Sequence, residues 1–321
     1  MRPYKFMPCL KGKLWGGDRI AAFKGLPAAA GVGESWEISG VPGSESVTAD
    51  RGLAGDPDVG VTLGELVERY REQLVGADVY RRFGRQFPLL VKFIDARQDL
   101  SVQVHPDDAL AQARHGSFGK TEMWYVVKAE PGAKIYAGLR KPLTPGQYEE
   151  MVRSGEGERF LDEFVACHES HEGDLFFLPA GRLHAIGAGN FIAEIQQTSD
   201  ITYRVYDYGR RDADGRQREL HVAEAKDAID YRVQPAYRSS YDSTASESEL
   251  VSCPHFRVSR VVVRGASRVD LKRDSFVVAA CLRGEAVLNG VAVRQGETLL
   301  VPAAENVLYI FGDAAFLTAT M

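Results

Sequence analysis

The chain has 321 residues, of which 45% are hydrophobic and 26% charged, as is typical of a folded protein of about two domains. The net charge of −5 gives no basic surface for nucleic acid or an anionic membrane, so we expect neither as a partner. No apolar run approaches the ~18 residues of a membrane span, and the N-terminus lacks the apolar core of a signal peptide. The four cysteines form no C-x-x-C pair, which argues against a cysteine zinc site or disulfide framework and favours a reduced, cytoplasmic protein.

The first 86 residues predict short strands followed by a helical insertion. Strand-like segments occur at residues 34–39 and 45–49, and Trp15-Gly16-Gly17 resembles a turn with a large aromatic side chain. Residues 62–65 form a capping box, after which apolar residues follow helical spacing as far as about residue 83. We therefore expect helices near 62–86.

Residues 87–95, F-P-L-L-V-K-F-I-D, are nearly all apolar and predict a fully buried strand. Lys92 is the exception, because a lysine is seldom fully buried without a partner. Its side chain either extends out to solvent or faces an anionic ligand.

Residues 100–105 alternate between polar and apolar side chains. Ser101, Gln103 and His105 share one face of this predicted strand. Pro106 ends it, and the following aspartates are suited to cap a short helix. A second strand begins near residue 122, with Lys120 and Glu122 again on one face.

Two short helices are predicted at 144–166, followed by the segment G-D-L-F-F-L-P-A-G-R-L-H at 173–184. Here a buried strand at 175–178 stops at Pro179, and Gly181 permits a tight reversal that directs His184 inward. The spacing is a signature of the cupin barrel, a small antiparallel jelly roll that holds a metal. For this segment alone, an ordinary strand-turn-strand with a core histidine is the favoured interpretation.

The chain continues with a strand at 190–197, which carries Glu194 and Gln196 on one face, and with a strand that carries Arg204. A helix is predicted near residues 222–229. Residues 234–248 are polar and serine-rich, which predicts a linker or an irregular connection. We therefore expect a catalytic domain at 1–235, with helical insertions near 62–86 and 144–166, and a C-terminal β domain at 236–321.

Residues 296–303, G-E-T-L-L-V-P-A, repeat the pattern of residues 173–180, G-D-L-F-F-L-P-A. The second copy has Val307 where the first has His184, and no histidine follows His255. The repeat predicts a mainly β fold of two cupin-like jelly-roll barrels with a small helical insertion. The second barrel is degenerate, so the chemistry is expected in the first.

Four side chains are predicted to converge in the first barrel: Gln103, His105, Glu122 and His184. Two imidazoles with carboxylate and amide oxygens suit Zn²⁺, or Fe²⁺, Mn²⁺ or Co²⁺ in the same site. Strands with inward alternation bring such residues to one point of a barrel lumen. The remaining histidines fall in polar contexts, mostly loops or helices, and are interpreted as ordinary: His115, His168, His171, His221 and His255.

Three cations, Lys92, Lys120 and Arg204, are predicted to bracket the same lumen in an otherwise acidic protein. They favour an anionic substrate, and phosphate suits both arginine and lysine. The alternative is that they form salt bridges with nearby acidic residues: Glu194, Asp200 or Asp207.

Several motifs together resemble the type I mannose-6-phosphate isomerase family, closest to its short bacterial members. These are W-G-G (15–17), E-S-W-E-I-S-G (34–40), V-Q-V-H-P-D-D (102–108), G-K-T-E-M-W-Y (119–125), L-P-A-G-R-L-H-A-I (178–186) and S-D-I-T-Y-R-V-Y-D (199–207). The resemblance implies a zinc enzyme that interconverts mannose 6-phosphate and fructose 6-phosphate.

The resemblance also assigns roles to residues. It places the metal ligands at Gln103, His105, Glu122 and His184. It places the catalytic arginine, lysine and acidic residue at Arg204, Lys120 and Glu194, and a serine at Ser101. Substrate binding is expected of Ser101 and Lys92.

One motif departs from the family pattern. Longer members have Asn-His-Lys-Pro-Glu, whereas this chain has Phe-Gly-Lys-Thr-Glu at 118–122, so Gly119 replaces the histidine. A mechanism that uses this histidine as a base is therefore excluded here.

Two other functions remain open from the sequence. One is a different metal-dependent cupin enzyme, such as a dioxygenase or a glucose-6-phosphate isomerase of the cupin type. The other is a cupin that binds a sugar phosphate without turnover. Whether the chain is a monomer or a homodimer is also open.

Overall fold

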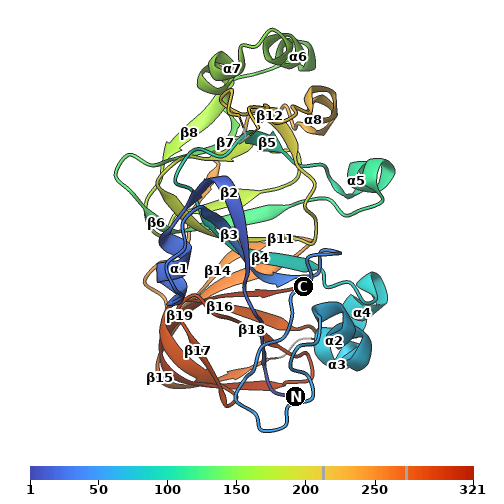
Figure 1. Ribbon diagram of the computed structural model, residues 1–321, viewed down its shortest axis with the longest axis vertical. Coiled ribbons are helices and arrows are strands. Elements are labelled where there is room, and N and C mark those ends of the chain that lie inside the picture. The colour runs from blue at the N-terminus through green and yellow to red at the C-terminus, as the bar shows by residue number, and fades with distance from the viewer. Residues whose placement is uncertain (212–213, 272–273) are drawn as a thin grey trace.

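The computed structural model describes residues 1–211, 214–271 and 274–321, and its strands form three antiparallel sheets (Figure 1). The five-stranded sheet has the order β12 (Tyr203–Tyr206), β5 (Val102–Val104), β10 (His184–Ile186), β7 (Lys134–Leu139), β8 (Val165–Glu169). One seven-stranded sheet has the order β13 (Arg238–Ser239), β9 (Leu175–Leu178), β6 (Glu122–Ala129), β11 (Asn190–Gln197), β4 (Leu89–Asp95), β3 (Val32–Ser39), β2 (Cys9–Gly17). The third sheet has the order β1 (Tyr4–Lys5), β18 (Thr298–Val301), β16 (Val277–Leu288), β19 (Val307–Thr320), β15 (Arg257–Asp270), β14 (Glu247–Ser252), with β17 (Val291–Arg294) paired to β16.

The helices are short and lie outside the sheets: α1 (Arg19–Lys24), α2 (Leu63–Tyr70), α3 (Glu72–Val75), α4 (Ala77–Phe83), α5 (Asp108–His115), α6 (Pro145–Arg153), α7 (Gly157–Phe164) and α8 (Val222–Ala228) (Figure 1). The predicted capping box at Thr62 forms, because its side chain accepts from the Glu65 amide and the Glu65 carboxylate accepts from the Thr62 amide. None of the described helices is long and apolar enough to cross a membrane.

Alternation along the strands creates an enclosed polar space between the five-stranded sheet and the seven-stranded sheet that contains β6. On β11, Phe191, Ala193 and Ile195 pack toward the third sheet, in the core cluster that they share with it. The even-numbered residues of β11 face the five-stranded sheet. There Ile192 packs in a core cluster separate from the one that holds Phe191, Ala193 and Ile195. Glu194, on the same face, therefore points into the space between the two sheets.

The third sheet has an apolar core of its own, formed by side chains of β15–β19 such as Leu288, Leu299 and Phe316. The repeated sequence pattern is a repeated structure: β9 and β18 are both four-residue strands that follow a glycine with positive φ, 87° at Gly173 and 79° at Gly296. The mainly β fold with small helical insertions is thus confirmed. The two closed barrels and the domain boundary at 235 and 236 stay predictions.

Two local predictions were wrong. Trp15-Gly16-Gly17 is the end of strand β2 and not a turn. Glycine occurs at both positions because the backbone packs too closely there for a side chain. A Cβ on Gly16 would lie 2.5 Å from Gly33 N, and one on Gly17 would lie 2.2 Å from Asp95 Oδ2. Residues 45–49 make only isolated bridges. The segment 234–248, expected as a linker or an irregular connection, is irregular except for β13 and the start of β14.

Candidate active site and metal centre

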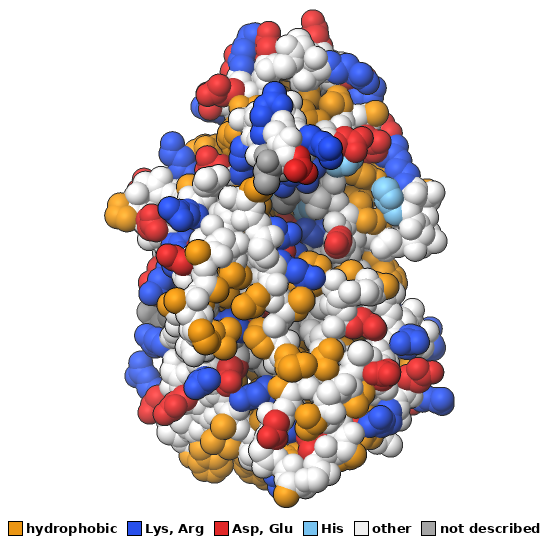
Figure 2. All heavy atoms as spheres, in the orientation of Figure 1, with side chains coloured by type: hydrophobic (Ala, Val, Ile, Leu, Met, Phe, Trp, Pro, Cys, Tyr) orange, Lys and Arg blue, Asp and Glu red, His pale blue; other side chains and the backbone are white. Residues whose placement is uncertain are grey.

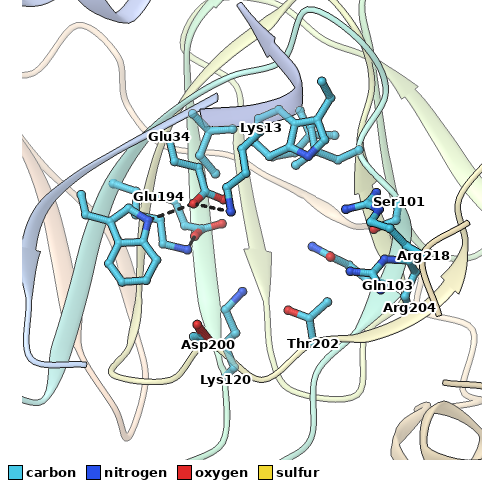
Figure 3. A pocket seen from close by; sticks show the side chains of 16 residues that line it. Lys13, Glu34, Ser101, Gln103, Lys120, Glu194, Asp200, Thr202, Arg204 and Arg218 are labelled. Carbon is cyan, nitrogen blue, oxygen red and sulfur yellow. Dashed lines mark hydrogen bonds and ion pairs between the residues drawn. The ribbon is translucent and has the colours of Figure 1, made fainter. Parts of the chain in front are cut away.

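A pocket of about 310 Å³ opens between the five-stranded sheet and the neighbouring seven-stranded sheet. Figure 2 shows a hollow on this face of the molecule, with Lys and Arg side chains in and around it. Figure 3 shows the labelled lining residues pointing into the pocket from both sheets and from the segment after β11. The lining comprises Lys13, Trp15, Glu34, Trp36, Lys92, Ile94, Leu100, Ser101, Gln103, Lys120, Ile186, Glu194, Asp200, Thr202, Arg204 and Arg218.

His105, Glu122 and His184 meet beside this pocket. Their potential ligand atoms all lie within 4.8 Å of one another, and all three residues are buried. Glu122 on β6 lies between the imidazoles: its Oε2 is 3.4 Å from His105 Nε2 and its Oε1 is 3.3 Å from His184 Nε2. The two sheets thus supply the cluster together, His184 from β10 and Glu122 from β6, with His105 directly after β5.

Each histidine is oriented by its second ring nitrogen. His105 Nδ1 donates to the Ile201 carbonyl at 2.9 Å, and His184 Nδ1 donates to the Arg182 carbonyl at 2.8 Å. These bonds favour the tautomer with a proton on Nδ1, which leaves the Nε2 lone pair directed at Glu122.

The charges at the cluster suit a metal ion. Burial, together with the ammonium of Lys120, lowers the pKa of His105 to about 3, and burial lowers the pKa of His184. Burial alone would raise the pKa of Glu122, but Lys120 and the two histidines hold it well below its usual range. Neutral imidazoles and an ionised carboxylate are the protonation states that metal ligands require.

Unpartnered buried atoms indicate that the cluster is built for a further group. His184 Nε2 and Glu122 Oε1 are buried without a hydrogen-bond partner among the described residues, and Glu122 Oε2 has the ammonium of Lys120 as an ion-pair partner. Polar atoms in a protein interior are normally paired, so two unpaired ligand atoms at one point fit a cation that they would ligate. Gln103 is the cross-strand neighbour of His184 and lines the adjacent pocket.

Lys120 connects the cluster to the pocket. Its Nζ lies 2.9 Å from Glu122 Oε2 and 3.0 Å from His105 Nε2, while the residue also lines the pocket. An ammonium in this position compensates the Glu122 charge and can donate a proton to a ligand in the pocket.

The pocket wall formed by β2, β3, β4 and β11 pairs each cation with a carboxylate. Lys92 Nζ lies 3.1 Å from Glu194 Oε1, and Lys13 Nζ lies 3.2 Å from Glu34 Oε2. The other carboxylate oxygen of Glu194 accepts from Trp124 Nε1 at 2.7 Å. Lys92 therefore forms a salt bridge with Glu194, which is one of the pairings that the sequence left open. Despite its burial its pKa is raised, chiefly by Glu194 and Glu34.

The opposite wall holds Ser101, Gln103, Arg204 and Arg218 (Figure 3). Arg204 on β12 is the cross-strand neighbour of Gln103. Its Nη1 donates to the Glu219 carbonyl at 2.9 Å, and its Nε is buried without a hydrogen-bond partner. Among the described residues no carboxylate lies within ion-pairing distance of Arg204, in contrast to Lys92.

The structure thus brings the predicted residues to one place. His105, Glu122 and His184 form the cluster, and the pocket beside it is lined by the others: Ser101, Lys92, Gln103, Lys120, Glu194 and Arg204. Sequence reasoning missed Lys13, Arg218 and the pocket-lining roles of Glu34 and Trp36. The last two lie in the motif at 34–40, but a single sequence gives no signal for Lys13 or Arg218.

The departure at residue 119 has a steric cause. A Cβ on Gly119 would lie 2.6 Å from the carbonyl carbon of Asp107 and from the amide nitrogen of Asp108. The start of α5 therefore occupies the space that any side chain at 119 would need.

Comparisons with known proteins identify relatives of this chain. Residues 4–130 match a family model for the catalytic domain of type I phosphomannose isomerase. The chain is 32% identical over 308 residues to the mannose-6-phosphate isomerase ManA of Bacillus subtilis, covering 94% of this chain and 93% of that protein. The crystal structure of the mannose 6-phosphate isomerase from Bacillus subtilis matches with a TM-score of 0.86 at 30% identity, over 100% of both chains.

A more distant structure, a mannose 6-phosphate isomerase bound with zinc and yttrium, shares the fold at 16% identity, with a TM-score of 0.79 over 99% of both chains. The matches to ManA and to the Bacillus subtilis crystal structure cover nearly all of this chain and nearly all of those proteins. They confirm the family resemblance seen in the sequence motifs. The chain belongs to the type I mannose-6-phosphate isomerase family.

Proposed function

We propose that this protein is a metal-dependent aldose–ketose isomerase that interconverts mannose 6-phosphate and fructose 6-phosphate through a cis-enediol. The observation that carries the proposal is the buried His105–Glu122–His184 cluster beside a pocket lined by lysines and arginines. A sugar phosphate is an anion with several hydroxyl groups, and this pocket offers cations, carboxylates and two tryptophans as matching contacts.

The metal in this proposal is one Zn²⁺ ion per chain, held by Gln103, His105, Glu122 and His184. The donor set of two imidazoles, a carboxylate and an amide supports zinc, and so does the zinc-bound structure of the same fold. When bound, the ion supplies Lewis acidity that favours negative charge on the reacting oxygens of the sugar.

The protein's own residues would do the remaining work. Isomerisation moves a proton between C1 and C2, which requires a base, a proton donor for the oxygens and stabilisation of the enediolate charge. We assign Glu194 to proton transfer, because its carboxylate lines the pocket and is fixed by Trp124 and Lys92. Lys120 lines the pocket beside the cluster and would donate to an oxygen of the sugar.

Arg204 would bind a negatively charged group of the substrate, because it lines the pocket with no carboxylate partner among the described residues. Ser101 and Lys92 would bind the substrate. Ser101 and Arg204 lie at one end of the pocket and Glu194 lies at the other (Figure 3). Lys92 is at the Glu194 end, because its Nζ is 3.1 Å from Glu194 Oε1.

A cytoplasmic location is part of the same proposal. All four cysteines are free, which suits a reducing compartment.

A coupled assay tests the function. The purified protein is mixed with mannose 6-phosphate or with glucose 6-phosphate, and formation of fructose 6-phosphate is followed. We expect turnover of mannose 6-phosphate to exceed that of glucose 6-phosphate. Turnover of glucose 6-phosphate alone would assign the chain to the competing isomerase reaction, and turnover of neither would contradict the proposal.

A further inference from the structure

The two walls of the pocket carry different charge. On one wall Lys92 is paired with Glu194, and Lys13 is paired with Glu34, so two cations face two carboxylates. On the other wall Arg204 and Arg218 both line the pocket. Figure 3 shows the two arginines together with Ser101 on one side of the pocket, away from Lys13, Glu34 and Glu194.

Asp207 holds Arg218 in place. Arg218 Nε donates to Asp207 Oδ2 at 2.8 Å, and its Nη2 donates to Oδ1. This two-point contact fixes the plane of the guanidinium and does not use Nη1. Asp207 is buried, and the side chain of Arg218 is 28% exposed, so the arginine is anchored from the interior and reaches the pocket from there.

The carboxylate of Asp207 also binds a second arginine, Arg210. Arg210 also donates to Asp207 Oδ1, and a second contact to the Asp99 carbonyl holds it away from the pocket. Arg204, Arg210 and Arg218 thus stand near one buried carboxylate, which leaves this wall with excess positive charge. Burial and then the charge of Arg218 lower the pKa of Arg204, so the two pocket arginines are close enough to repel each other.

The same chain segment braces Arg204. The Glu219 carbonyl, next to Arg218, accepts from Arg204 Nη1, and His221 Nδ1 accepts from the Arg204 amide at 3.0 Å. The guanidinium of Arg204 is fixed by a neutral carbonyl and keeps its full charge available. Two guanidinium groups held side by side, with unused donors and a nearby hydroxyl, are suited to a dianion such as a phosphate group.

We propose that Arg218, oriented by Asp207, forms with Arg204 and Ser101 the phosphate-binding end of the pocket. The inference rests on the proposed function and deepens it, because it fixes which end of the sugar phosphate lies at which wall. The phosphate lies at the arginine wall, and the sugar extends toward Lys92 and Glu194. Arg218 is a binding residue, and Asp207 is a positioning residue that acts through it.

The test compares Arg218→Ala with the matched control Arg210→Ala. Both variants remove one guanidinium partner of Asp207, but only Arg218 lines the pocket. We expect Arg218→Ala to raise KM for mannose 6-phosphate and the inhibition constant of inorganic phosphate by about tenfold to a hundredfold, the effect of losing a charged hydrogen bond. Metal content should stay unchanged, kcat should fall less than KM rises, and Arg210→Ala should change KM less than about threefold.

Arg218→Lys provides a second variant that keeps the charge and loses the two-point contact. Its phosphate affinity should lie between those of the wild type and Arg218→Ala. Equal effects of Arg218→Ala and Arg210→Ala would overturn the inference, because they would show a merely structural role. A fall in kcat with KM and phosphate inhibition unchanged would overturn it as well.

Failure of the proposed function can be told apart from failure of this inference. Binding of inorganic phosphate to the wild-type protein and to Arg218→Ala is measured by calorimetry, which needs no turnover. If phosphate binds the wild type and binds Arg218→Ala more weakly, the phosphate end stands even where mannose 6-phosphate is not isomerised. If both proteins bind phosphate equally, the inference is wrong whatever the substrate.

Discussion

Glu122 Oε1 and His184 Nε2 lie 3.3 Å apart in the interior, and neither atom has a hydrogen-bond partner among the described residues. The two residues come from facing sheets, so the contact joins β6 to β10 across the polar space of the protein. Burying carboxylate and imidazole atoms without hydrogen-bond partners costs free energy unless a cation binds to them. The cluster therefore leads to a direct prediction about metal content.

Replacing His184 by Ala should lower bound zinc from about one ion per chain to near zero, because a site with three or four protein ligands loses most of its affinity with one of them. Elemental analysis of the purified protein measures this. His171→Ala is the control, since the side chain of His171 is 63% exposed and lies outside the cluster. Full zinc retention in His184→Ala would refute the ligand assignment.

Replacing Arg204 by Ala should lower kcat/KM for mannose 6-phosphate by a factor of about a hundred or more, because it removes charged hydrogen bonds to the phosphate of the substrate. Zinc content should not change, because Arg204 is not part of the cluster. Steady-state kinetics together with elemental analysis separate the two effects. Activity near that of the wild type would remove Arg204 from the mechanism.

Replacing Lys92 by Met should lower the free energy of unfolding by about 3 kcal/mol, because it leaves Glu194 and Glu34 buried beside an uncharged side chain. The double variant Lys92→Met, Glu194→Met should recover part of this loss, since it removes an unpaired charge. Urea unfolding of the wild type, both single variants and the double variant gives the coupling energy. Strictly additive effects would show that the 3.1 Å pair is not coupled.

Replacing His168 by Gln should reduce acid sensitivity between about pH 7 and 5. Burial lowers the pKa of His168, so the folded protein keeps it neutral where an unfolded histidine, with a pKa of about 6.5, is already protonated. The unfolded state therefore binds more protons below pH 6.5, and His168 makes stability fall with pH. Zinc-loaded wild type and variant are compared by thermal unfolding at several pH values. Parallel curves would contradict this assignment.

Much of the site was predictable because strand alternation has a period of two. The pattern at 100–105 placed Ser101, Gln103 and His105 on one face, and the structure puts their apolar neighbours, such as Val102 and Val104, in a separate core cluster. The glycine–strand–proline pattern at 173–180 and its repeat at 296–303 were also readable, because a positive φ and a proline define where such a strand begins and ends.

The missed features depend on contacts between distant segments. Strand β1 at the N-terminus pairs with β18 near the C-terminus, and Lys13 pairs with Glu34 across neighbouring strands. Arg218 enters the pocket because Asp207 holds it. Asp207 ends the motif at 199–207, but Arg218 lies outside every motif that the sequence offers. The sequence Trp15-Gly16-Gly17 predicts a turn, but the structure has a closely packed strand end there. In a sequence, glycine is equally consistent with a chain reversal and with close packing.

Metal-dependent isomerisation is tested most directly by following fructose 6-phosphate formation from mannose 6-phosphate before and after treatment with a chelator, and again after Zn²⁺ is restored. We expect turnover by the untreated protein, loss of nearly all of it in step with the removal of zinc, and recovery on addition of Zn²⁺. Undiminished turnover by protein shown to be free of metal would contradict metal-dependent isomerisation at this site.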